Sequence, residues 1–389
     1  MEAGPVKMPD FTALIIGCGT IGSATARLAL EDARFEHVVV ADKDRQRAER
    51  LAGSLEGPAT ALELNCQQDD QVLRSLTGIS VVLNTTGPFS RDTLSLMRTV
   101  IEAGVAYADI NDDVETLQSV FESEYLDSLA KHRGVGVLPG LGASPGQTNV
   151  LARHLASRMD AVEEVRFFMV NDATYRSEAV WRHRLALFGE PALLYDGGRW
   201  TQTPAMSEFQ DVGFPAPWGS IRCYAVGLET VSIPQSFSGL RHASLWRGFS
   251  DPATTSMLKD LIDAGFASQQ PLEVDGVSLT PSAMTAAVLA GTQTEADSPD
   301  LGRLPRQVRV KGIRNGGPAE LTMTYSFPPG DIGLATASCL VVGAGLLVNR
   351  ELPGPGVFPP EDMDPAPFMW DMESRGAHFK LEDSASTRT

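Results

Sequence analysis

The fold class follows from the stretch Phe11–Glu31, "FTALIIGCGTIGSATARLALE". Within it, "ALII" is typical of a short buried strand, and "SATARLALE" has the apolar spacing of a helix. Between them Gly17, Gly19 and Gly22 have GxGxxG spacing. The first glycine permits a tight turn, the second lets backbone approach a pyrophosphate, and the third lets helix and strand pack closely. We therefore expect a strand–turn–helix unit whose helix N-terminus faces the phosphates of a dinucleotide.

A second predicted strand, "HVVVAD", ends at Asp42. A carboxylate about twenty residues after the glycines binds the ribose hydroxyls of the adenosine half, and its charge repels the 2′-phosphate of NADP. The sequence therefore favours NAD. Lys43 and Arg45 follow closely and are positively charged, so NADP is the alternative. The competing interpretation of the unit is a doubly wound fold that has lost its ligand.

Strands and helices continue to alternate up to about residue 140, which predicts a doubly wound parallel sheet with ligands at its carboxyl edge. Two segments reach this edge: Asn84–Phe89, "NTTGPF", and Asp109–Asp113, "DINDD". A plain turn between strand and helix is the alternative for the first. A third segment, Val137–Asn149, "VLPGLGASPGQTN", is too rich in glycine and proline for regular structure and too apolar for an ordinary exposed loop.

Composition limits the class of partner. The chain has 389 residues and a formal net charge of −17, which argues against nucleic acid and anionic membranes as partners. It has no run of 18 apolar residues, no signal-peptide pattern and four isolated cysteines, so we expect a reduced, cytoplasmic protein. Neither HExxH nor CxxC is present, so we expect no metal.

Several motifs occur together in one order: "IIGCGTIG", "VVVADKD", "VVLNTTGPF", "GVAYADI", "LPGLGASPGQTNVLA", "ATASCLVVGAGLLV" and "GVFPPEDM". With these motifs the chain resembles the saccharopine dehydrogenase family, and within it the lysine 6-dehydrogenase type. The resemblance implies a cleft between two domains for a nicotinamide cofactor and an amino-acid substrate, and a homodimer. Saccharopine reductases carry Cys and Asp where this chain has Leu141 and Ser144. The resemblance therefore leaves the substrate open.

The domains expected from these motifs are a dinucleotide-binding Rossmann domain at 9–140 and an inserted α+β substrate and dimerisation domain at 141–335. A segment at 336–380 would return to the first domain, and 381–389 would be a disordered tail. Within the inserted domain, the pattern "SEAVWRHRLALFGEPALLYDGG" predicts one helix.

In this arrangement the Pro-Gly segment would pass the nicotinamide, because glycine lets backbone lie flat against a ligand and proline fixes the path. A rigid hinge without ligand contact is the alternative. The expected cofactor contacts are Gly17, Gly19, Thr20, Ile21, Gly22, Asp42, Lys43, Asn84, Thr85, Thr86, Gly87, Pro88, Asp109, Ala143 and Pro145.

The expected chemistry is NAD(P)-dependent oxidation of a CH–N bond in a small amino acid, or reduction of the imine, which needs a base near the nitrogen. The catalytic candidates are His183, Tyr175 and Glu229, although His183 also fits a surface position on a helix. The expected substrate contacts are Gly146, Gln147, Asn149, Glu178 and Arg247, with Arg247 offering a fork for a carboxylate. The alternatives are a reductase of enoyl or carbonyl groups and a dinucleotide-binding protein without turnover.

Overall fold

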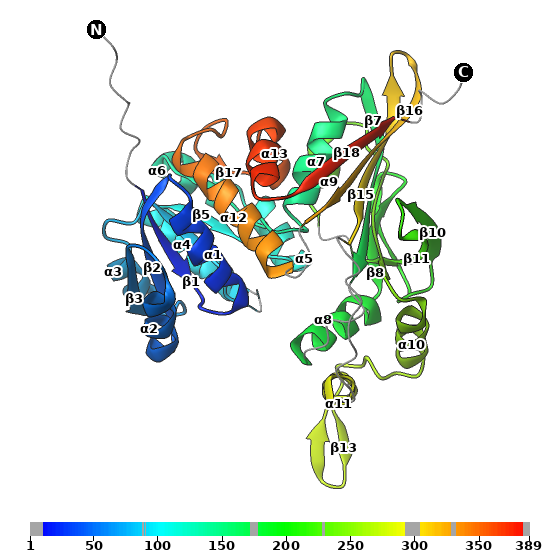
Figure 1. Cartoon of the computed structure of the whole chain (residues 1–389), viewed down its shortest axis with the longest axis horizontal. Helices are drawn as coiled ribbons and strands as arrows, with labels where there is room; N and C mark the ends of the chain where they lie inside the picture. The colour runs from blue at the N-terminus through cyan, green and yellow to red at the C-terminus, as the bar shows by residue number, and fades with distance from the viewer. Residues whose placement is uncertain are drawn as a thin grey trace. The chain divides into compact units, whose positions relative to one another are not determined.

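A computed structural model describes residues 11–87, 89, 91–171, 178–227, 230–291, 304–327 and 332–383. The chain forms two compact units (Figure 1). Unit 1 comprises residues 1–154, 229–233 and 330–376, and unit 2 comprises 155–228, 234–329 and 377–389. Unit 1 thus contains the expected dinucleotide domain, the Pro-Gly segment and most of the returning segment.

Unit 1 is built on a seven-stranded sheet with the order β17-β6-β5-β4-β1-β2-β3. Every neighbouring pair is parallel, as the alternation of strands and helices predicts. The strands are β1 (Phe11–Ile16), β2 (Phe35–Asp42), β3 (Ala59–Glu63), β4 (Val81–Asn84), β5 (Ala106–Asp109), β6 (Gly136–Leu138) and β17 (Gly356–Val357). The apolar strands are buried because helices cover both faces of the sheet.

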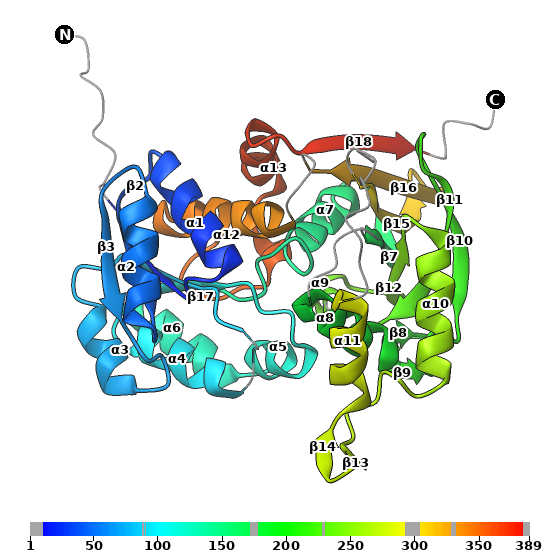
Figure 2. The ribbon, with the colours of Figure 1, turned by 60° about the horizontal axis from the view of Figure 1, so that its bottom comes forward.

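The helices of unit 1 lie on both faces of this sheet, with α1 and α12 side by side on one and α4 and α6 on the other (Figure 2). They are α1 (Thr20–Glu31), α2 (Arg45–Ser54), α3 (Asp69–Ser75), α4 (Arg91–Glu102), α5 (Val114–Phe121), α6 (Glu124–Arg133), α7 (Gln147–Ala156), α12 (Ile332–Val348), the 3-10 helix η1 (Pro360–Asp362) and α13 (Pro365–Ser374). Helix α7 crosses the boundary between the units.

Buried ion pairs fix the returning segment to the first helix of unit 1. Arg34 pairs with Asp32 at 2.6 Å and with Asp371 on α13 at 2.7 Å, and Arg375 also reaches Asp32 at 2.7 Å. Burial opposes ionisation of Asp32, but the hydrogen bonds and charges of the arginines hold its pKa below the usual value. The absence of a side chain at Gly345 makes room for Arg34, because a Cβ there would lie 2.3 Å from the guanidinium carbon.

Unit 2 contains a nine-stranded mixed sheet with the main order β10-β11-β12-β7-β15-β16-β18, to which β8 and β9 attach beside β12. Its strands are β7 (Ala161–Asn171), β8 (Ala192–Asp196), β9 (Arg199–Thr203), β10 (Phe209–Phe214), β11 (Gly219–Val226), β12 (His242–Phe249), β15 (Arg306–Arg314), β16 (Gly317–Ser326) and β18 (His378–Asp383). Only the pair β12–β7 is parallel among the described pairings of this sheet.

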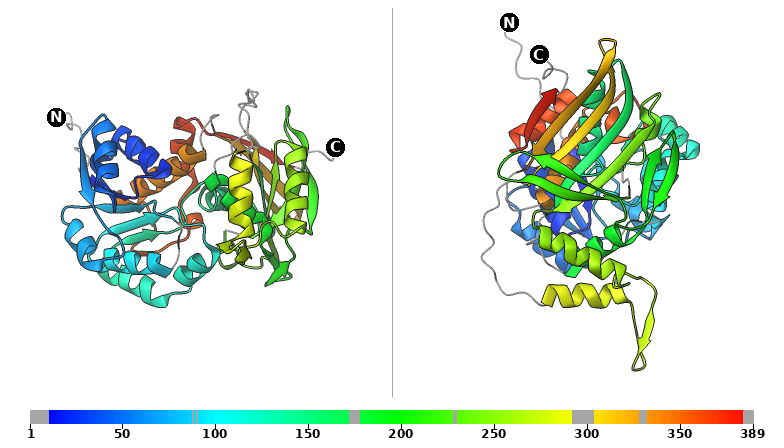
Figure 3. Two further views of the ribbon diagram at one scale, coloured as in Figure 1. Left: turned by 90° about the horizontal axis from the view of Figure 1, so that it is seen from below. Right: turned by 90° about the vertical axis from the view of Figure 1, so that its right-hand side faces the viewer.

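Unit 2 also contains helices and a small hairpin, and the hairpin projects away from the large sheet (Figure 3). They are α8 (Glu178–Gly189), α9 (Ile233–Ser236), α10 (Pro252–Asp263), β13 (Leu272–Val274), β14 (Val277–Leu279) and α11 (Pro281–Gly291). No helix within the described ranges is long and apolar enough to cross a membrane. The long apolar helix α12 is instead a core element of unit 1.

Two predictions about local structure are wrong. The single helix expected over residues 177–198 ends at Gly189 and is followed by strand β8, whose tyrosine and leucines suit a half-buried sheet position. The disordered tail expected from residue 381 does not begin there, because β18 continues to Asp383 and pairs with β16. Residues 384–389 lie outside the described part of the chain.

Candidate cofactor and substrate site

The glycine loop at the carboxyl end of β1 has the conformation that its sequence predicts. Gly17 has φ of +102°, a region that L side chains rarely adopt. A Cβ on Gly22 would lie 1.7 Å from the carbonyl oxygen of Gly17, so only glycine allows this approach of helix to loop. A Cβ on Gly19 would meet no protein atom within 4 Å. The second glycine therefore faces open space, which is the cradle that a pyrophosphate needs.

The N-terminus of α1 leaves its backbone donors available. Gly19 is the N-cap residue, and no side chain caps the helix. The N–H groups of the first turn, which includes Thr20 and Ile21, carry the positive end of the helix dipole. This end of α1 therefore fits a dinucleotide phosphate, as a helix N-terminus does in other phosphate sites.

Asp42 lies at the carboxyl end of β2, directly beside the glycine loop. Its Oδ2 accepts a hydrogen bond from the Cys18 N–H at 2.9 Å, and its Oδ1 accepts one from the Asp44 N–H at 3.0 Å. Arg47 lies at 4.0 Å from Oδ2, whereas Lys43 is exposed. The carboxylate is thus fixed at the expected ribose position with part of its accepting capacity unused.

The turn after β4 holds the glycine loop from a second side. The Thr85 hydroxyl donates to the carbonyls of Gly17 at 2.9 Å and Ile16 at 3.0 Å. The Asn84 side-chain oxygen accepts from the Thr86 N–H at 3.0 Å and from its hydroxyl at 2.6 Å. Gly87 ends the described part of this turn, and the expected contact Pro88 lies outside the described residues.

A buried chain of hydrogen bonds connects three expected segments. Asn84 Nδ2 donates to the Tyr107 hydroxyl at 2.9 Å, and that hydroxyl donates to Asp109 Oδ2 at 2.9 Å. Asp109 Oδ1 accepts from the N–H groups of Asn111 at 3.1 Å and Gly140 at 2.8 Å. Burial raises the pKa of Asp109 to about 6, although these hydrogen bonds oppose the shift. Asp109 therefore positions the start of the Pro-Gly segment.

The Pro-Gly segment closes on itself as a compact turn before α7. Gly142 N–H donates to the Pro145 carbonyl at 2.9 Å, and Gln147 N–H donates to the Gly142 carbonyl at 2.9 Å. Gly146 has φ of +116°, and a Cβ there would lie 2.2 Å from the Gly142 oxygen. Ala143 is buried within this turn. The glycines are therefore required by the turn itself, and the turn fixes the side chains that follow it.

Four side-chain atoms near this turn are buried without a hydrogen-bond partner among the described residues: Asn111 Nδ2, Ser144 Oγ, Gln147 Nε2 and Gln147 Oε1. Buried polar groups are normally paired, and leaving them unpaired costs about 1–3 kcal/mol each. The cluster therefore fits a polar ligand that supplies the missing partners, such as an amide. Ser144 and Asn111 were not among the predicted contacts, although both lie in segments that the sequence indicated.

Asn149, an expected substrate contact, has a structural role instead. Its Oδ1 accepts from the Gly146 N–H at 3.0 Å, and its Nδ2 donates to Glu361 Oε2 at 2.8 Å. Arg153, one turn further along α7, donates to the Glu361 carbonyl at 2.8 Å. The two motifs "ASPGQTN" and "GVFPPEDM" are thereby joined within unit 1. Because both ends of the Asn149 amide are engaged, the geometry does not support direct binding of substrate by this side chain.

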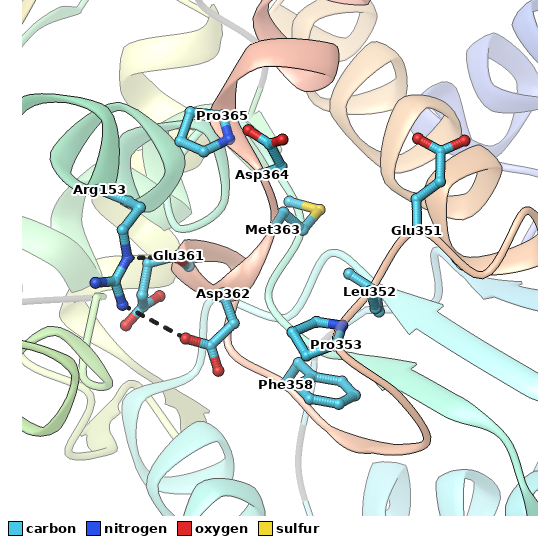
Figure 4. A pocket seen from close by; sticks show the side chains of 10 residues that line it. All are labelled: Arg153, Glu351, Leu352, Pro353, Phe358, Glu361, Asp362, Met363, Asp364 and Pro365. Carbon is cyan, nitrogen blue, oxygen red and sulfur yellow. Dashed lines mark hydrogen bonds and ion pairs between the residues drawn. The ribbon is translucent and has the colours of Figure 1, made fainter. Parts of the chain in front are cut away.

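A shallow hollow beside this junction has a volume of about 710 Å³ (Figure 4). Arg153 lies on one wall with Asp362 at 3.5 Å, and Glu351 lies on the other. Burial raises the pKa of Asp362, and the charge of Arg153 opposes that rise. None of the lining residues belongs to the glycine loop or the unpartnered polar cluster. The hollow is therefore distinct from the carboxyl edge of the sheet, where we expect the cofactor to bind.

The structure places Glu178, His183 and Arg247 in unit 2. Glu178 is exposed and pairs with Arg182 one turn along α8 at 2.7 Å, and His183 is also exposed on this helix. Tyr175 and Glu229 lie outside the described residues. The exposure of His183 agrees with the surface alternative, and its pairing leaves Glu178 in an ordinary ion pair on the helix surface.

Arg247 is a buried residue of β12, with 8% of its surface exposed. It is in register with Met169 on β7, and Met169 is in register with Arg306 on β15, so both arginines share one face of the sheet. Arg184 lies 5.1 Å from the Phe249 ring on that face. Among the described residues of unit 2, these three arginines are the buried charged side chains. This face therefore carries three buried guanidinium groups.

No group of three or more histidine, cysteine, aspartate or glutamate side chains is arranged for a metal ion in the described ranges. The residues present do fit a dinucleotide. The glycine cradle and helix N-terminus suit the phosphates, Asp42 suits a ribose, and the unpartnered polar cluster suits an amide.

Comparison with known proteins supports this assignment. Residues 13–135 match the family model "Saccharopine dehydrogenase NADP binding domain". The chain is 23% identical to carboxyaminopropylagmatine dehydrogenase of Synechocystis, with 93% of this chain and 95% of that protein covered. It is 20% identical to carboxynorspermidine synthase of Vibrio cholerae, again with 93% and 95% covered.

Solved structures show the same fold. Saccharopine dehydrogenase (L-Glu forming) from Saccharomyces cerevisiae has a TM-score of 0.73 at 13% identity, covering 96% of this chain and 99% of that one. Homospermidine synthase from Legionella pneumophila, solved in complex with NAD, has a TM-score of 0.64 at 11% identity, covering 96% and 92%. Residues 13–135 therefore match the saccharopine dehydrogenase NADP-binding domain family, and the chain is a saccharopine dehydrogenase-like NAD(P)-binding oxidoreductase.

Proposed function

We propose that this oxidoreductase acts on the CH–N bond of a small amine that carries a carboxylate, or on the corresponding imine. The observation that carries the proposal is the unpartnered polar cluster of Asn111, Ser144 and Gln147 beside an intact dinucleotide cradle. A protein that only bound the dinucleotide through its phosphates and ribose would gain nothing from keeping these buried groups unpaired. Their position after β5 and β6 is the carboxyl edge, where ligands of doubly wound sheets react.

The reaction balances as a two-electron oxidation. The C–H bond beside the nitrogen breaks and the carbon gives up a hydride; a dinucleotide held by the glycine loop and the N-terminus of α1 would supply the nicotinamide acceptor. The nitrogen loses a proton, so that an iminium product forms, and water then converts it into a carbonyl compound and a free amine. The reverse direction joins an amine and a carbonyl compound and reduces their imine. The residues of this chain bind and orient the reactants and hold the proton.

Two substrate classes compete within this reaction. The relatives are named for carboxyaminopropylagmatine and carboxynorspermidine, which are carboxylated polyamines by name. The sequence motifs instead resemble lysine 6-dehydrogenases, whose substrate is an amino acid. Both classes carry a carboxylate and a second nitrogen. We favour the carboxylated polyamine, because the relatives named for such compounds match over nearly the whole chain.

Arg247 is the proposed carboxylate ligand. It is buried on the face of the unit 2 sheet that also carries Arg184 and Arg306. A guanidinium offers two parallel donors that match the two oxygens of a carboxylate, and the bond is stronger where water is excluded. An ion pair within the protein is the rival role for Arg247, and it predicts that substitution harms stability more than substrate affinity.

The base remains one of three proposed residues, His183, Tyr175 and Glu229. A histidine base would give a pH–rate profile with a limb near its usual pKa of about 6.5. If His183 acts in this way, His183→Gln removes that limb and lowers kcat by about two orders of magnitude. Unchanged kcat in this variant would leave His183 as a surface residue of α8 and assign the role to Tyr175 or Glu229.

For the cofactor we propose NAD in preference to NADP, because Asp42 lies beside the glycine loop at the end of β2, where we expect the ribose. The matching family model is named for NADP, and Arg47 at 4.0 Å from Asp42 is a potential partner for a 2′-phosphate. The preference therefore depends on which is stronger at the 2′-position of the ribose: the repulsion of a phosphate by the Asp42 carboxylate or its attraction by the neighbouring cations.

The deciding experiment follows NAD(P)H absorbance at 340 nm with three sets of reactants. The first is L-lysine with NAD⁺ or NADP⁺. The second is a secondary amine in which a diamine is linked to a carboxylate-bearing chain, with the same cofactors. The third is a diamine plus an aldehyde that bears a carboxylate, with NADH or NADPH. We expect turnover in the second and third sets. Turnover with lysine alone would favour the amino-acid class, and none in any set would overturn the CH–N proposal.

A further inference from the structure

Tyr107 lies in unit 1 between the turn after β4 and the start of the Pro-Gly segment, and its side chain is fully buried. Asn84 and Asp109 are in register on β4 and β5, and Tyr107 is two residues before Asp109, so the three side chains share one face of the sheet. The Tyr107 hydroxyl is 2.9 Å from Asn84 Nδ2 and 2.9 Å from Asp109 Oδ2. One oxygen atom therefore links two strands whose carboxyl ends lie at the edge where we expect the cofactor.

Backbone groups fix the direction of this chain of hydrogen bonds. The Thr86 N–H can only donate, and it lies 3.0 Å from the side-chain oxygen of Asn84, so the amide nitrogen of Asn84 must face Tyr107. Two further N–H groups, from the segments after β5 and β6, donate to Asp109 Oδ1. Asp109 Oδ2 accepts from Tyr107. The hydroxyl therefore accepts from Asn84 and donates to Asp109.

The ionisation states of Tyr107 and Asp109 suit this direction. Burial, followed by the charge of Asp109, raises the pKa of Tyr107 well above its usual value, so the hydroxyl keeps the proton that it donates. Burial raises the pKa of Asp109 to about 6, so at pH 7.5 the carboxylate is ionised and can only accept. Asn84, Tyr107 and Asp109 are buried and bonded to one another, so they act on a ligand only through the segments that they hold.

We propose that Tyr107 is a positioning residue for the reaction, an inference that rests on the proposed function. At one end of the chain, Asn84 holds the turn in which Thr85 bonds to the glycine loop. At the other end, Asp109 holds the start of both segments that carry the unpartnered polar cluster. The hydroxyl thus sets the separation between the loop proposed for the phosphates and the groups proposed for the reacting ligand.

The rate of hydride transfer is sensitive to such a separation, because a displacement of about 1 Å in the reacting groups can lower the rate about 100-fold. Affinity is less sensitive, since the glycine loop, the N-terminus of α1 and Asp42 are the groups that fit the phosphates and a ribose. Loss of the Tyr107 hydroxyl should therefore lower kcat with little change in the dissociation constant of NADH. A purely structural role for Tyr107 predicts instead that stability falls while kcat of the folded protein is unchanged.

The test reverses the direction of the chain without changing its charge. Asn84→Asp gives the hydroxyl two acceptors, and Asp109→Asn gives it two donors, so each single variant leaves one group of the chain without its partner. The double variant Asn84→Asp, Asp109→Asn restores a donor at one end and an acceptor at the other, with the charge of the wild type. It also keeps the oxygen atoms that accept from the backbone N–H groups at both ends.

Three quantities are measured at pH 7.5 in each folded variant. They are kcat for a secondary amine that links a diamine to a carboxylate-bearing chain, the dissociation constant of NADH, and the gain in NADH fluorescence on binding, which increases as the nicotinamide ring is held more firmly. Tyr107→Phe and both single variants should lower kcat about tenfold or more and the fluorescence gain by about half, with the dissociation constant within about threefold of wild type. The double variant should recover kcat and the fluorescence gain to within about threefold of wild type. The control Tyr125→Phe removes a hydroxyl from an exposed tyrosine of α6 and should match the wild type.

A folded Tyr107→Phe protein with the kcat and fluorescence gain of the wild type would overturn the proposal. So would a double variant that does not fold, or one that folds and is no better than its single variants. If Tyr107→Phe itself does not fold, the comparison of the double variant with its single variants decides. If the wild type oxidises none of the amines, the proposed function fails, whereas the fluorescence gain of bound NADH still decides the role of Tyr107.

Discussion

The carboxylate of Asp42 accepts a hydrogen bond from the backbone N–H of Cys18, with 2.9 Å between Oδ2 and nitrogen. This bond ties the end of β2 to the glycine loop, so the carboxylate that we propose for the ribose is fixed relative to the loop that we propose for the phosphates. The Cys18 thiol does not compete for the role, because burial, and next the charge of Asp42, raise its pKa to about 11. Asp42 is therefore placed before any cofactor binds, and its charge acts at a defined point.

Asp42→Asn should lower the affinity for NADH, and it should shift the ratio of the two affinities in favour of NADPH. The amide keeps one oxygen for the Cys18 N–H but loses the charge that repels a 2′-phosphate. A tenfold change in the NADH to NADPH ratio, equivalent to about 1.4 kcal/mol, is the expected size. Fluorescence titration of both cofactors measures it. Asp44→Asn is the matched control, because it removes the same charge nearby and asparagine still caps α2. An unchanged ratio in Asp42→Asn would contradict the cofactor assignment.

Two variants of the glycine loop should have different effects: Gly22→Ala should lower stability, and Gly19→Ala should weaken NADH binding. The new Cβ at Gly22 would lie 1.7 Å from the Gly17 oxygen, so the helix must move and the protein should lose about 3 kcal/mol or more of stability. The new Cβ at Gly19 meets nothing within 4 Å, so the melting temperature should stay within about 2 °C while NADH binding weakens. Thermal melts and NADH titration test both. Equal NADH affinity in a folded Gly19→Ala protein would show that the cradle is not the phosphate site.

The sequence alone predicted those parts of the molecule whose physics is local. The glycine spacing, the apolar strands and Asp42 lie within 32 residues, and each follows from a short-range rule. The doubly wound class was confirmed for the same reason. Helix α5 was missed because its eight residues contain too few periods for a clear apolar pattern.

Long-range partnerships were beyond the sequence. Asn149 and Glu361 are 212 residues apart, and no pattern at either position indicates that the amide is held by that carboxylate. The row Arg247–Met169–Arg306 likewise exists only through strand pairing across three distant segments. Whether a buried polar atom such as those of Gln147 finds a partner depends on all of its neighbours. Composition cannot supply that information.

Gln147→Leu should lower activity without lowering stability, whereas Asn149→Leu, two positions further along the chain, should lower stability. The Gln147 amide is buried without a partner, so an apolar replacement should hold or raise stability by up to about 1 kcal/mol while kcat/KM falls at least tenfold. The Asn149 amide holds Gly146 and Glu361, so its replacement should lower stability by about 2–3 kcal/mol. Urea unfolding and steady-state kinetics provide both readouts. Full activity in Gln147→Leu would remove the unpartnered cluster from the site.

As the pH rises from about 4 to about 6, the protein should lose stability because of Asp109. Its pKa is about 6 in the folded state, against 3.8 as the ordinary value, chiefly because of burial. In this window the folded state keeps a proton that the unfolded state has released, so raising the pH favours unfolding. From pH 4.5 to 7.5 the group should lower the free energy of unfolding by about 2 kcal/mol. Asp109→Asn should remove this contribution, whereas Asp70→Asn, at an exposed position that does not act on Asp109, should not. Urea unfolding at the two pH values decides, and an equal slope in wild type and Asp109→Asn would contradict the assignment.

Arg247→Ala should raise KM for a carboxylated amine far more than for the same amine without its carboxylate. Arg247 is 8% exposed, and a charge-assisted pair in such a setting is worth about 2–3 kcal/mol, or a factor of roughly 30 to 150 in KM. Arg247→Lys should recover only part of this, because an ammonium lacks the two parallel donors. The control is Arg222→Ala on the neighbouring strand, an exposed arginine paired with Asp211, which should leave both KM values unchanged. The comparison of the two amines separates substrate binding from stability. If Arg247→Ala instead lowers the melting temperature and affects both amines equally, the side chain is part of an internal ion pair, and the carboxylate must be bound by another residue.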